Sequence, residues 1–376
     1  MNTNKTPLSK PQFGLTLIEL LVAMVIGVFI IGGISQVFIA TKHSNKILMA
    51  ETELQENARF AFSVITNIVR KAGNLGCKAP SETNTTSLLD FNEGTFRPWM
   101  AIEGWEANNT SYGTNYTPAV TAQTLVTPNS HWSSISNTVL DDGISSVPNS
   151  DILKIWHTAD KSGALSVVTD DTLNFSTIDI EQGDIVVLND CKSVTFLQAC
   201  NCDTSDGPAC SGNDQRIDIS PSACNTPGNK VFNSADINVA TADVQVLEQS
   251  VFVIGKRDQN QSDIASLFIY KLSHDGKLGE REEILEGLES MQIQYGEDTN
   301  NNNSPNYYVN AHQVGNWKHV VSIRMSLLMR SFKNNLLAEP QNINFNGAKV
   351  SIPNNDRYLR RVYSSTIALR NRNIGY

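Results

Sequence analysis

The sequence carries no signature of a common enzyme or nucleotide-binding site. It contains no GxxxxGK[ST] phosphate loop, no HExxH zinc motif and no GxSxG nucleophile elbow. Histidine is scarce, with 6 in 376 residues. Only His312 and His319 lie close together, and we interpret them as ordinary surface or turn histidines. We therefore predict no catalytic residues, no metal site and no cofactor.

An excess of positive charge is also missing. The chain has 29 Lys and Arg against 38 Asp and Glu, which gives a net charge of −9 at pH 7. Binding to nucleic acid needs a basic face that neutralises phosphates. We therefore do not expect nucleic acid as a partner.

The cysteines lack the spacing of a zinc site. There is no CxxC pair, and the cysteine-rich stretch 191–224 contains no histidine. A loop-rich, cysteine-dense segment is typical of disulfides in an oxidising compartment, with metal binding as the alternative. Cys200 and Cys202 are too close in sequence to pair comfortably with each other. Sequence leaves the pairing open among the six candidates, Cys77, Cys191, Cys200, Cys202, Cys210 and Cys224.

The amino-terminal segment predicts a retained membrane span. Residues 1–14 are polar, contain Lys5 and Lys10 and have no acid, and residues 15–41 are almost wholly apolar. As a helix, residues 15–41 would span about 40 Å, enough to cross a bilayer. The positive leader is expected to stay in the cytoplasm while the rest is exported. No convincing small-x-small cleavage site follows the apolar run.

One acid, Glu19, interrupts this apolar run. An ionised carboxylate at mid-bilayer costs about 2.5–3.5 kcal/mol on insertion scales, and the run contains no Lys or Arg to pair with it. Cleavage after Gly14 would create an amine on Leu15 at the same depth, on this chain or a neighbour. The alternative is a carboxylate that reaches the membrane surface or becomes protonated.

Residues 14–19, GLTLIE, resemble the prepilin processing motif of type IV pilins and type II secretion pseudopilins. The resemblance implies that a prepilin peptidase cuts between Gly14 and Leu15 and methylates the new terminus at Leu15. Glu19 would be the fifth mature residue and would form the assembly salt bridge. Leu15 departs from the family's usual Phe, although both side chains are large and apolar.

The helical pattern continues through residues 42–73 as an amphipathic segment. Arg70 and Lys71 followed by Gly73 are typical of a helix C-terminus. A continuous helix from Leu15 to Ala72 would be about 87 Å long, a rod that suits a filament subunit. Steps of three and four separate the apolar positions Ile47, Ala50, Leu54, Ala58, Ala61, Ile65, Ile68 and Ala72.

The remainder predicts a β-rich head, with residues 74–264 containing the cysteine-rich insert 191–224 and residues 265–376 forming a further sheet portion. Short apolar stretches bounded by Gly, Asp, Asn or Ser read as strands. Alternation near residues 291–295 and 321–329 predicts half-buried strands with one apolar face. The other predicted strands are Ile152–Trp156, Asp184–Leu188, Val251–Gly255 and Leu267–Leu272, the last followed by a hairpin turn at residues 274–277.

Asp298, Asn300 and Asn302 have the 1, 3, 5 spacing of oxygen ligands in a calcium loop. The sixth position is Asn303 instead of Gly, and the twelfth is Val309, which has no oxygen ligand. A plain polar turn is the preferred interpretation, and calcium binding is the alternative.

Two parts of the chain resemble the PilW family of minor pilins. One is the ENARFA segment from residue 56 with the glycines and cysteine of residues 73–77, and the other lies within residues 265–372. The resemblance implies an α+β pilin-like fold, with one long N-terminal helix packed on a large β-rich periplasmic head. Residues 78–264 match no family pattern that we can name, although an Asp-Cys pair resembling Asp190-Cys191 recurs in the PilW family.

The resemblance implies a non-enzymatic minor pilin that primes type IV pilus assembly and sits at or near the pilus tip. Its partners would be other minor pilins, the major pilin, the prepilin peptidase, the inner-membrane assembly platform and a tip adhesin. It would be a single-pass inner-membrane protein with a periplasmic head before assembly, and part of the surface pilus afterwards. The alternatives are a type II secretion pseudopilin, a pilus-displayed adhesin or ligand-binding module, and a membrane-tethered periplasmic enzyme.

Overall fold

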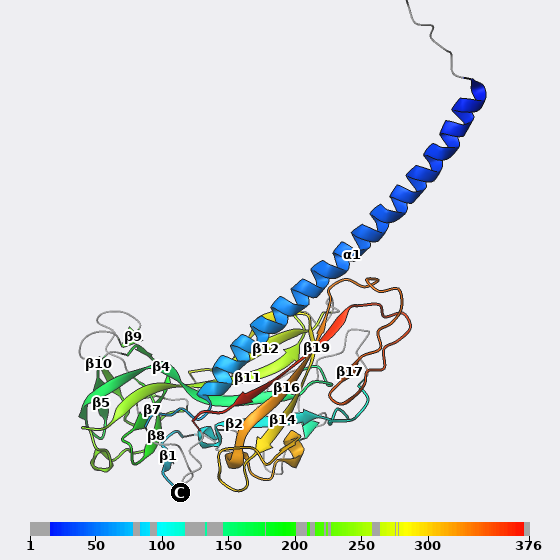
Figure 1. Cartoon of the computed structure of the whole chain (residues 1–376). Helices are drawn as coiled ribbons and strands as arrows, with labels where there is room; N and C mark the ends of the chain where they lie inside the picture. The colour runs from blue at the N-terminus through cyan, green and yellow to red at the C-terminus, as the bar shows by residue number, and fades with distance from the viewer. Residues whose placement is uncertain are drawn as a thin grey trace, which may run out of the picture. The chain divides into compact units, whose positions relative to one another are not determined.

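The computed structural model contains two compact units, Met1–Glu51 and Thr52–Tyr376. Figure 1 shows one long helix and a β-rich region, as the sequence predicts. The described residues are 16–77, 83–90, 96–116, 132–133, 146–176, 178–200, 209–210, 215–221, 223–224, 227–257, 264–274, 276 and 278–371.

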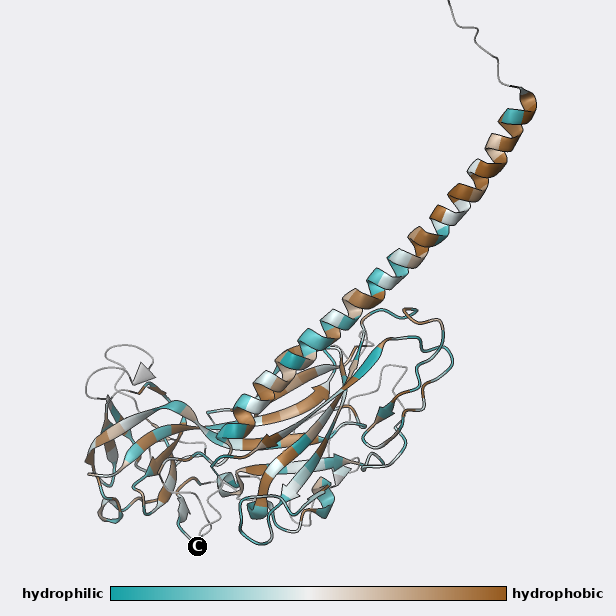
Figure 2. Cartoon of the chain, in the orientation of Figure 1, coloured by the Kyte–Doolittle hydropathy of each residue, from teal (hydrophilic) through white to brown (hydrophobic). Residues whose placement is uncertain are grey.

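Helix α1 (Leu17–Lys71) is a single element of 55 residues. It ends where predicted, because Gly73 adopts φ +73°, a left-handed conformation that closes helices at low cost in glycine. A side chain there would also meet Ala101, whose Cβ lies 3.0 Å from a Cβ built on Gly73. In Figure 2 the first half of the helix is mostly hydrophobic, and the second half alternates hydrophobic with hydrophilic residues.

Within the second unit, the predicted apolar stripe on α1 is confirmed with one correction, and before it Ile47 is half-buried. Ile68 is only half-buried, and Val69 takes its place in the stripe at 0% exposure. The 3.6-residue period reaches Val69 one turn after Ile65, so the two side chains share a face. The buried stripe positions in the second unit are Leu54, Ala58, Ala61, Ile65, Val69 and Ala72.

The described strands form two large sheets and two short antiparallel pairs, β6 with β9 and β17 with β18. An eleven-stranded sheet has the path β1-β8-β7-β11-β4-β2-β3 with β5, β10, β12 and β13 attached, and a four-stranded sheet has the order β15-β14-β16-β19. The strands are β1 (Thr85–Ser87), β2 (Ile102–Ala107), β3 (Trp132–Ser133), β4 (Ile152–Val168), β5 (Thr172–Phe175), β6 (Ile180–Glu181), β7 (Ile185–Asn189), β8 (Val194–Gln198), β9 (Ala209–Cys210), β10 (Gln215–Asp218), β11 (Asp243–Gly255), β12 (Ser266–Leu272), β13 (Leu278–Glu286), β14 (Leu288–Glu297), β15 (Tyr307–Val309), β16 (Val320–Arg330), β17 (Asn344–Phe345), β18 (Ala348–Lys349) and β19 (Arg360–Ala368). Short 3-10 helices are η1 (Pro98–Met100), η3 (Ser234–Asp236), η4 (Ala311–Gln313) and η5 (Trp317–His319).

Strands β4 and β11 are longer than predicted, and they carry the chain into a lobe with its own core. We call residues 163–244 the insert lobe. Figure 1 shows β5, β7, β8, β9 and β10 grouped in this lobe. The lobe's core consists of buried apolar side chains, Leu165, Leu173, Phe175, Ile178, Ile180, Val186, Leu188, Leu197, Ala199, Ile217, Ile219, Phe232, Ile237, Ala242 and Val244.

Strand β14 corrects the expectation of a half-buried strand, because it is buried on both faces, including Gln292 at 2% exposure. Strand β16 keeps the predicted alternation in part, with Arg324 exposed and Ser326 half-buried. Asp151, which precedes β4, bonds to the edge of β14 that is not paired with β16. The Asp151 amide donates to the Met291 oxygen at 2.8 Å, and Asp151 Oδ2 accepts from the Ile293 amide at 2.8 Å. Its Oδ1 accepts from the Ala107 amide at the end of β2 at 2.9 Å. One buried carboxylate thus joins the two sheets.

The last strand, β19, completes this sheet. It pairs antiparallel with β16 from Ser322 against Ala368 to Arg330 against Arg360. Beyond it, the Asn371 side chain donates to the Arg70 oxygen in the last turn of α1 at 3.2 Å. The C-terminal segment therefore returns to the end of the helix.

Four of the six cysteines form disulfides, as predicted. Cys77 pairs with Cys191 at a Cα separation of 5.2 Å, and Cys200 pairs with Cys224 at 5.5 Å. The expectation that Cys200 does not pair with Cys202 is therefore confirmed. Cys202 lies outside the described residues, and only the backbone of Cys210 is described, in β9.

Candidate functional site

The candidate site lies in the first turn of α1, where Thr16 and Glu19 form a reciprocal cap. The Thr16 amide and hydroxyl both donate to Glu19 Oε2 at 2.9 Å. The Glu19 amide donates in return to the Thr16 hydroxyl at 3.3 Å. This is a capping box, in which Thr and Glu three residues apart satisfy backbone amides that the helix itself cannot pair.

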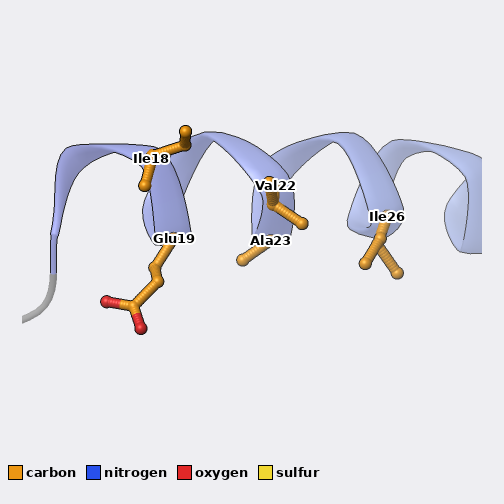
Figure 3. Close-up of a pocket in the computed structure, with 5 residues that line it drawn as sticks. All are labelled: Ile18, Glu19, Val22, Ala23 and Ile26. Carbon is orange, nitrogen blue, oxygen red and sulfur yellow. The ribbon is translucent and has the colours of Figure 1, made fainter.

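An apolar face continues from this cap along the helix. Figure 3 shows Glu19 at the start of a shallow surface lined by Ile18, Val22, Ala23 and Ile26. The helix contains an 18-residue window of mean hydropathy 2.7, of which 0% is buried within the protein. A helix of this length and composition can cross a membrane, and its side chains then meet lipid or other helices.

The structure describes one of the three residues predicted for processing and assembly. Glu19 lies where the sequence predicts, in the first turn, but Gly14 and Leu15 lie outside the described residues. Sequence reasoning missed the role of Thr16. The T-x-x-E spacing directly before an apolar run is a helix-start signature, and it would have identified Thr16 as the partner of Glu19.

This arrangement fixes the position of a negative charge in an apolar segment. Both Thr16 donors reach the same oxygen, Oε2, and one of them is the amide adjacent to Leu15. Attraction between opposite charges strengthens in a medium of low dielectric constant. A carboxylate held at this point can therefore bind a nearby ammonium group.

The possible calcium loop is organised by backbone amides. Asp298 is 0% exposed, and its Oδ1 accepts from the amides of Asn300 and Asn302 at 3.1 and 3.3 Å. Its Oδ2 accepts from the Asn303 amide at 2.7 Å. These bonds are those of a self-capped polar turn. No group of three or more His, Cys, Asp or Glu side chains that could hold a metal ion occurs within the described part of the chain.

A Ser–His–Glu set lies on the paired strands β4 and β11. His157 Nε2 lies 3.2 Å from the Ser250 hydroxyl, and its Nδ1 lies 3.2 Å from Glu248 Oε2. Burial lowers the pKa of His157. Ser250 is only 4% exposed, so a substrate has no access to its hydroxyl. The contacts follow from cross-strand positions in the sheet, where His157 is directly opposite Glu248, and they are structural.

Two family models match the chain. Residues 251–371 match the Type IV Pilus-assembly protein W family, PilW, and residues 9–35 match the Prokaryotic N-terminal methylation motif. The first match covers β12 to β19 and the end of β11, and the second covers the Thr16–Glu19 cap. PilW is a family of structural pilus-assembly proteins without enzymatic activity. No curated protein and no solved structure matched the chain.

Proposed function

We propose that this chain, a protein of the PilW type IV pilus-assembly family with an N-terminal methylation motif, is a minor pilin that primes filament growth and sits at or near the pilus tip. The observation that carries the proposal is the capped carboxylate of Glu19 at the start of a long apolar helix. In that position a negative charge serves to bind a positive terminus.

Processing would create that terminus. Cleavage between Gly14 and Leu15, followed by N-methylation of Leu15, would place a cation one residue before Thr16. Because Thr16 holds Glu19 Oε2, the other oxygen of the carboxylate is the one that would meet the amine of a neighbouring subunit. The pair would neutralise the cost of a carboxylate in lipid, about 2.5–3.5 kcal/mol at mid-bilayer.

The proposed organisation follows from this processing. Residues 1–14 would be removed as the leader, residues 15–41 would span the inner membrane, and residues 42–73 would present the stripe to the periplasmic head. Its partners would be the prepilin peptidase, the assembly platform, the major pilin and other minor pilins, with a tip adhesin among the candidates. The filament would carry the head to the cell surface.

The first test is mass spectrometry of the mature N-terminus, with N-methyl-leucine at position 15 as the expected result. A mature chain that starts at Met1 would refute the proposal. The second test replaces Glu19 with Gln, which keeps the shape but removes the charge. We expect the variant to be processed and retained in the membrane but to be largely lost from sheared pili.

The matched control is Glu53→Gln, because Glu53 is an exposed acid on the same helix outside the apolar run. The control should enter pili as the wild type does. Equal incorporation of the Glu19→Gln variant and the control would contradict the salt-bridge mechanism, while leaving the mass-spectrometry result to decide the class.

A display role is the second candidate, and the insert lobe favours it. The lobe has a hydrophobic core of its own and lies outside the PilW match of residues 251–371. A lobe that the shared region does not include is a natural place for a recognition surface. Binding of the full chain in detergent to an array of glycans would support this role, and no binding to any arrayed glycan would remove glycan adhesion from consideration.

A further inference from the structure

The last residue of α1 and the segment that follows it run along the eleven-stranded sheet before the chain contacts the insert lobe. We call these residues, 71–77, the strap. On the sheet side, the Gly73 amide donates to the Trp156 oxygen at 2.9 Å, and the Thr158 amide donates to the Asn74 oxygen at 3.1 Å. The Thr158 hydroxyl donates to the same oxygen at 3.0 Å. The strap therefore pairs with β4 shortly before that strand enters the insert lobe at residue 163.

The second half of the strap is attached to the lobe. Asn189, the last residue of β7, donates its side-chain amide to the Leu75 oxygen at 2.6 Å, and Cys77 is bonded to Cys191. Gly76 has φ +100°, and a Cβ on it would lie 2.7 Å from the Asn189 side chain. Only glycine allows the backbone to approach Asn189 so closely. Leu75 is 0% exposed and packs among side chains of β4, β7, β8 and β11.

The strap contacts β4 where the pairing between β4 and β11, the two strands that connect the lobe to the rest of the chain, is irregular. The chain enters the lobe through β4 and leaves it through β11, and their pairing shifts register between Gln245 and Leu247. Such an irregularity locally disrupts the hydrogen-bond ladder and bends the strand. Lys71 of the strap forms an ion pair of 2.6 Å with Asp160, which lies in β4 within this irregular stretch.

We propose that the strap locks the insert lobe to the last turn of α1, so that the lobe does not hinge or open about the β4–β11 irregularity. Hydrogen bonds and an ion pair hold the strap to β4, and one covalent bond holds it to the lobe. The Cys77–Cys191 disulfide is the decisive element, because it is a covalent bond between the strap and the residue two positions after β7 in the lobe, and thermal motion does not break it as it breaks single hydrogen bonds.

The test is hydrogen–deuterium exchange of the full chain in detergent, followed peptide by peptide. In the Cys77→Ser, Cys191→Ser double variant we expect exchange to speed up by more than tenfold in residues 71–77 and 156–162. Strands β14 and β16 should exchange as in the wild type. Unchanged exchange in the strap and in residues 156–162 would overturn the proposal.

Two further variants keep the test decisive. Cys200→Ser with Cys224→Ser removes the disulfide inside the lobe and should speed exchange only near that bond; the same pattern from both double variants would overturn the proposal. Gly76→Ala keeps all cysteines but displaces the strap from Asn189. If the Cys77→Ser, Cys191→Ser variant unfolds globally, faster exchange of the strap in the Gly76→Ala variant supports the lock. Wild-type exchange of the strap in Gly76→Ala refutes it.

Discussion

Burial of acids between the two sheets predicts that the head loses stability as the pH rises. Glu106 in β2 is 2% exposed, and burial raises its pKa from 4.5 to about 7. Burial and the nearby Glu106 also raise the pKa of Asp151. The uncharged phenol of Tyr295 is buried near these two acids, and burial together with the charges of both acids raises its pKa. Ionising Glu106 at this place therefore costs free energy.

The direction and the size of the change in the free energy of unfolding with pH follow from the linkage between proton binding and folding. The folded state keeps a proton on Glu106 in a pH range in which the unfolded chain has lost it, so the free energy of unfolding falls as the pH rises from about 4.5 through about 7. One pKa unit corresponds to about 1.4 kcal/mol, so the total effect is about 3 kcal/mol. Asp151 acts in the same direction.

The perturbation is Glu106→Gln, which stays neutral at every pH. The variant should match the wild type at pH 4 and exceed its stability by up to about 3 kcal/mol at pH 8. The assay is urea unfolding of the full chain in detergent, followed by tryptophan fluorescence, since Trp105 and Trp317 are buried. His157, whose pKa is lowered by burial, destabilises the fold as the pH falls below about 6.5, but it cancels in the difference between the two proteins.

The control for this experiment is Glu53→Gln, because Glu53 is exposed on α1 and its replacement should not change the pH profile. A difference in free energy of unfolding between the Glu106→Gln variant and the wild type that does not change between pH 5 and 8 would refute the reasoning. That result would mean that Glu106 has access to water or to a cation that burial alone does not indicate.

Three further predictions concern the helix and the cysteines. Ile65→Ala should lower the free energy of unfolding by about 2–4 kcal/mol because it empties a fully buried site, whereas Ile68→Ala, at a half-buried site, should cost clearly less; equal losses in urea unfolding would contradict the corrected stripe. Thr16→Ala should weaken the first turn of α1 by about 1 kcal/mol, seen as faster amide exchange there, and unchanged exchange would argue against the cap. Non-reducing peptide mapping should find Cys202 joined to Cys210, since the other four cysteines are already paired, and a free thiol at either would disprove this.

The helix and most of its stripe could be predicted from sequence because their signals are local. Periodic apolar positions and the Arg70, Lys71 and Gly73 terminus act within a few residues of each other. The exact stripe was misjudged at one turn, where Ile68 and Val69 are both apolar and composition could not choose between them. Only the surface that covers the helix decides which one is buried.

Strand β2 shows why other elements were not predicted. Its sequence, IEGWEA, contains two acids and a glycine, which look like a loop, yet all six residues are buried. Glu103 is paired with Arg97 at 2.7 Å, and Gly104 leaves room for the Tyr295 side chain. These partners lie in other elements, so no local pattern reports them. The backbone groups at one edge of β14 are satisfied in the same way by the distant Asp151.

Strand β19 covers one edge of the four-stranded sheet, so its loss would expose the backbone of β16. A chain without β19 would keep the pairing of β16 with β14 but would leave nine positions unpaired on the other edge of β16. The last turn of α1 would also lose its hydrogen bond from Asn371. Because an unpaired strand edge is a template for pairing with another chain, the strand that returns to the end of α1 also protects this sheet from edge-to-edge association.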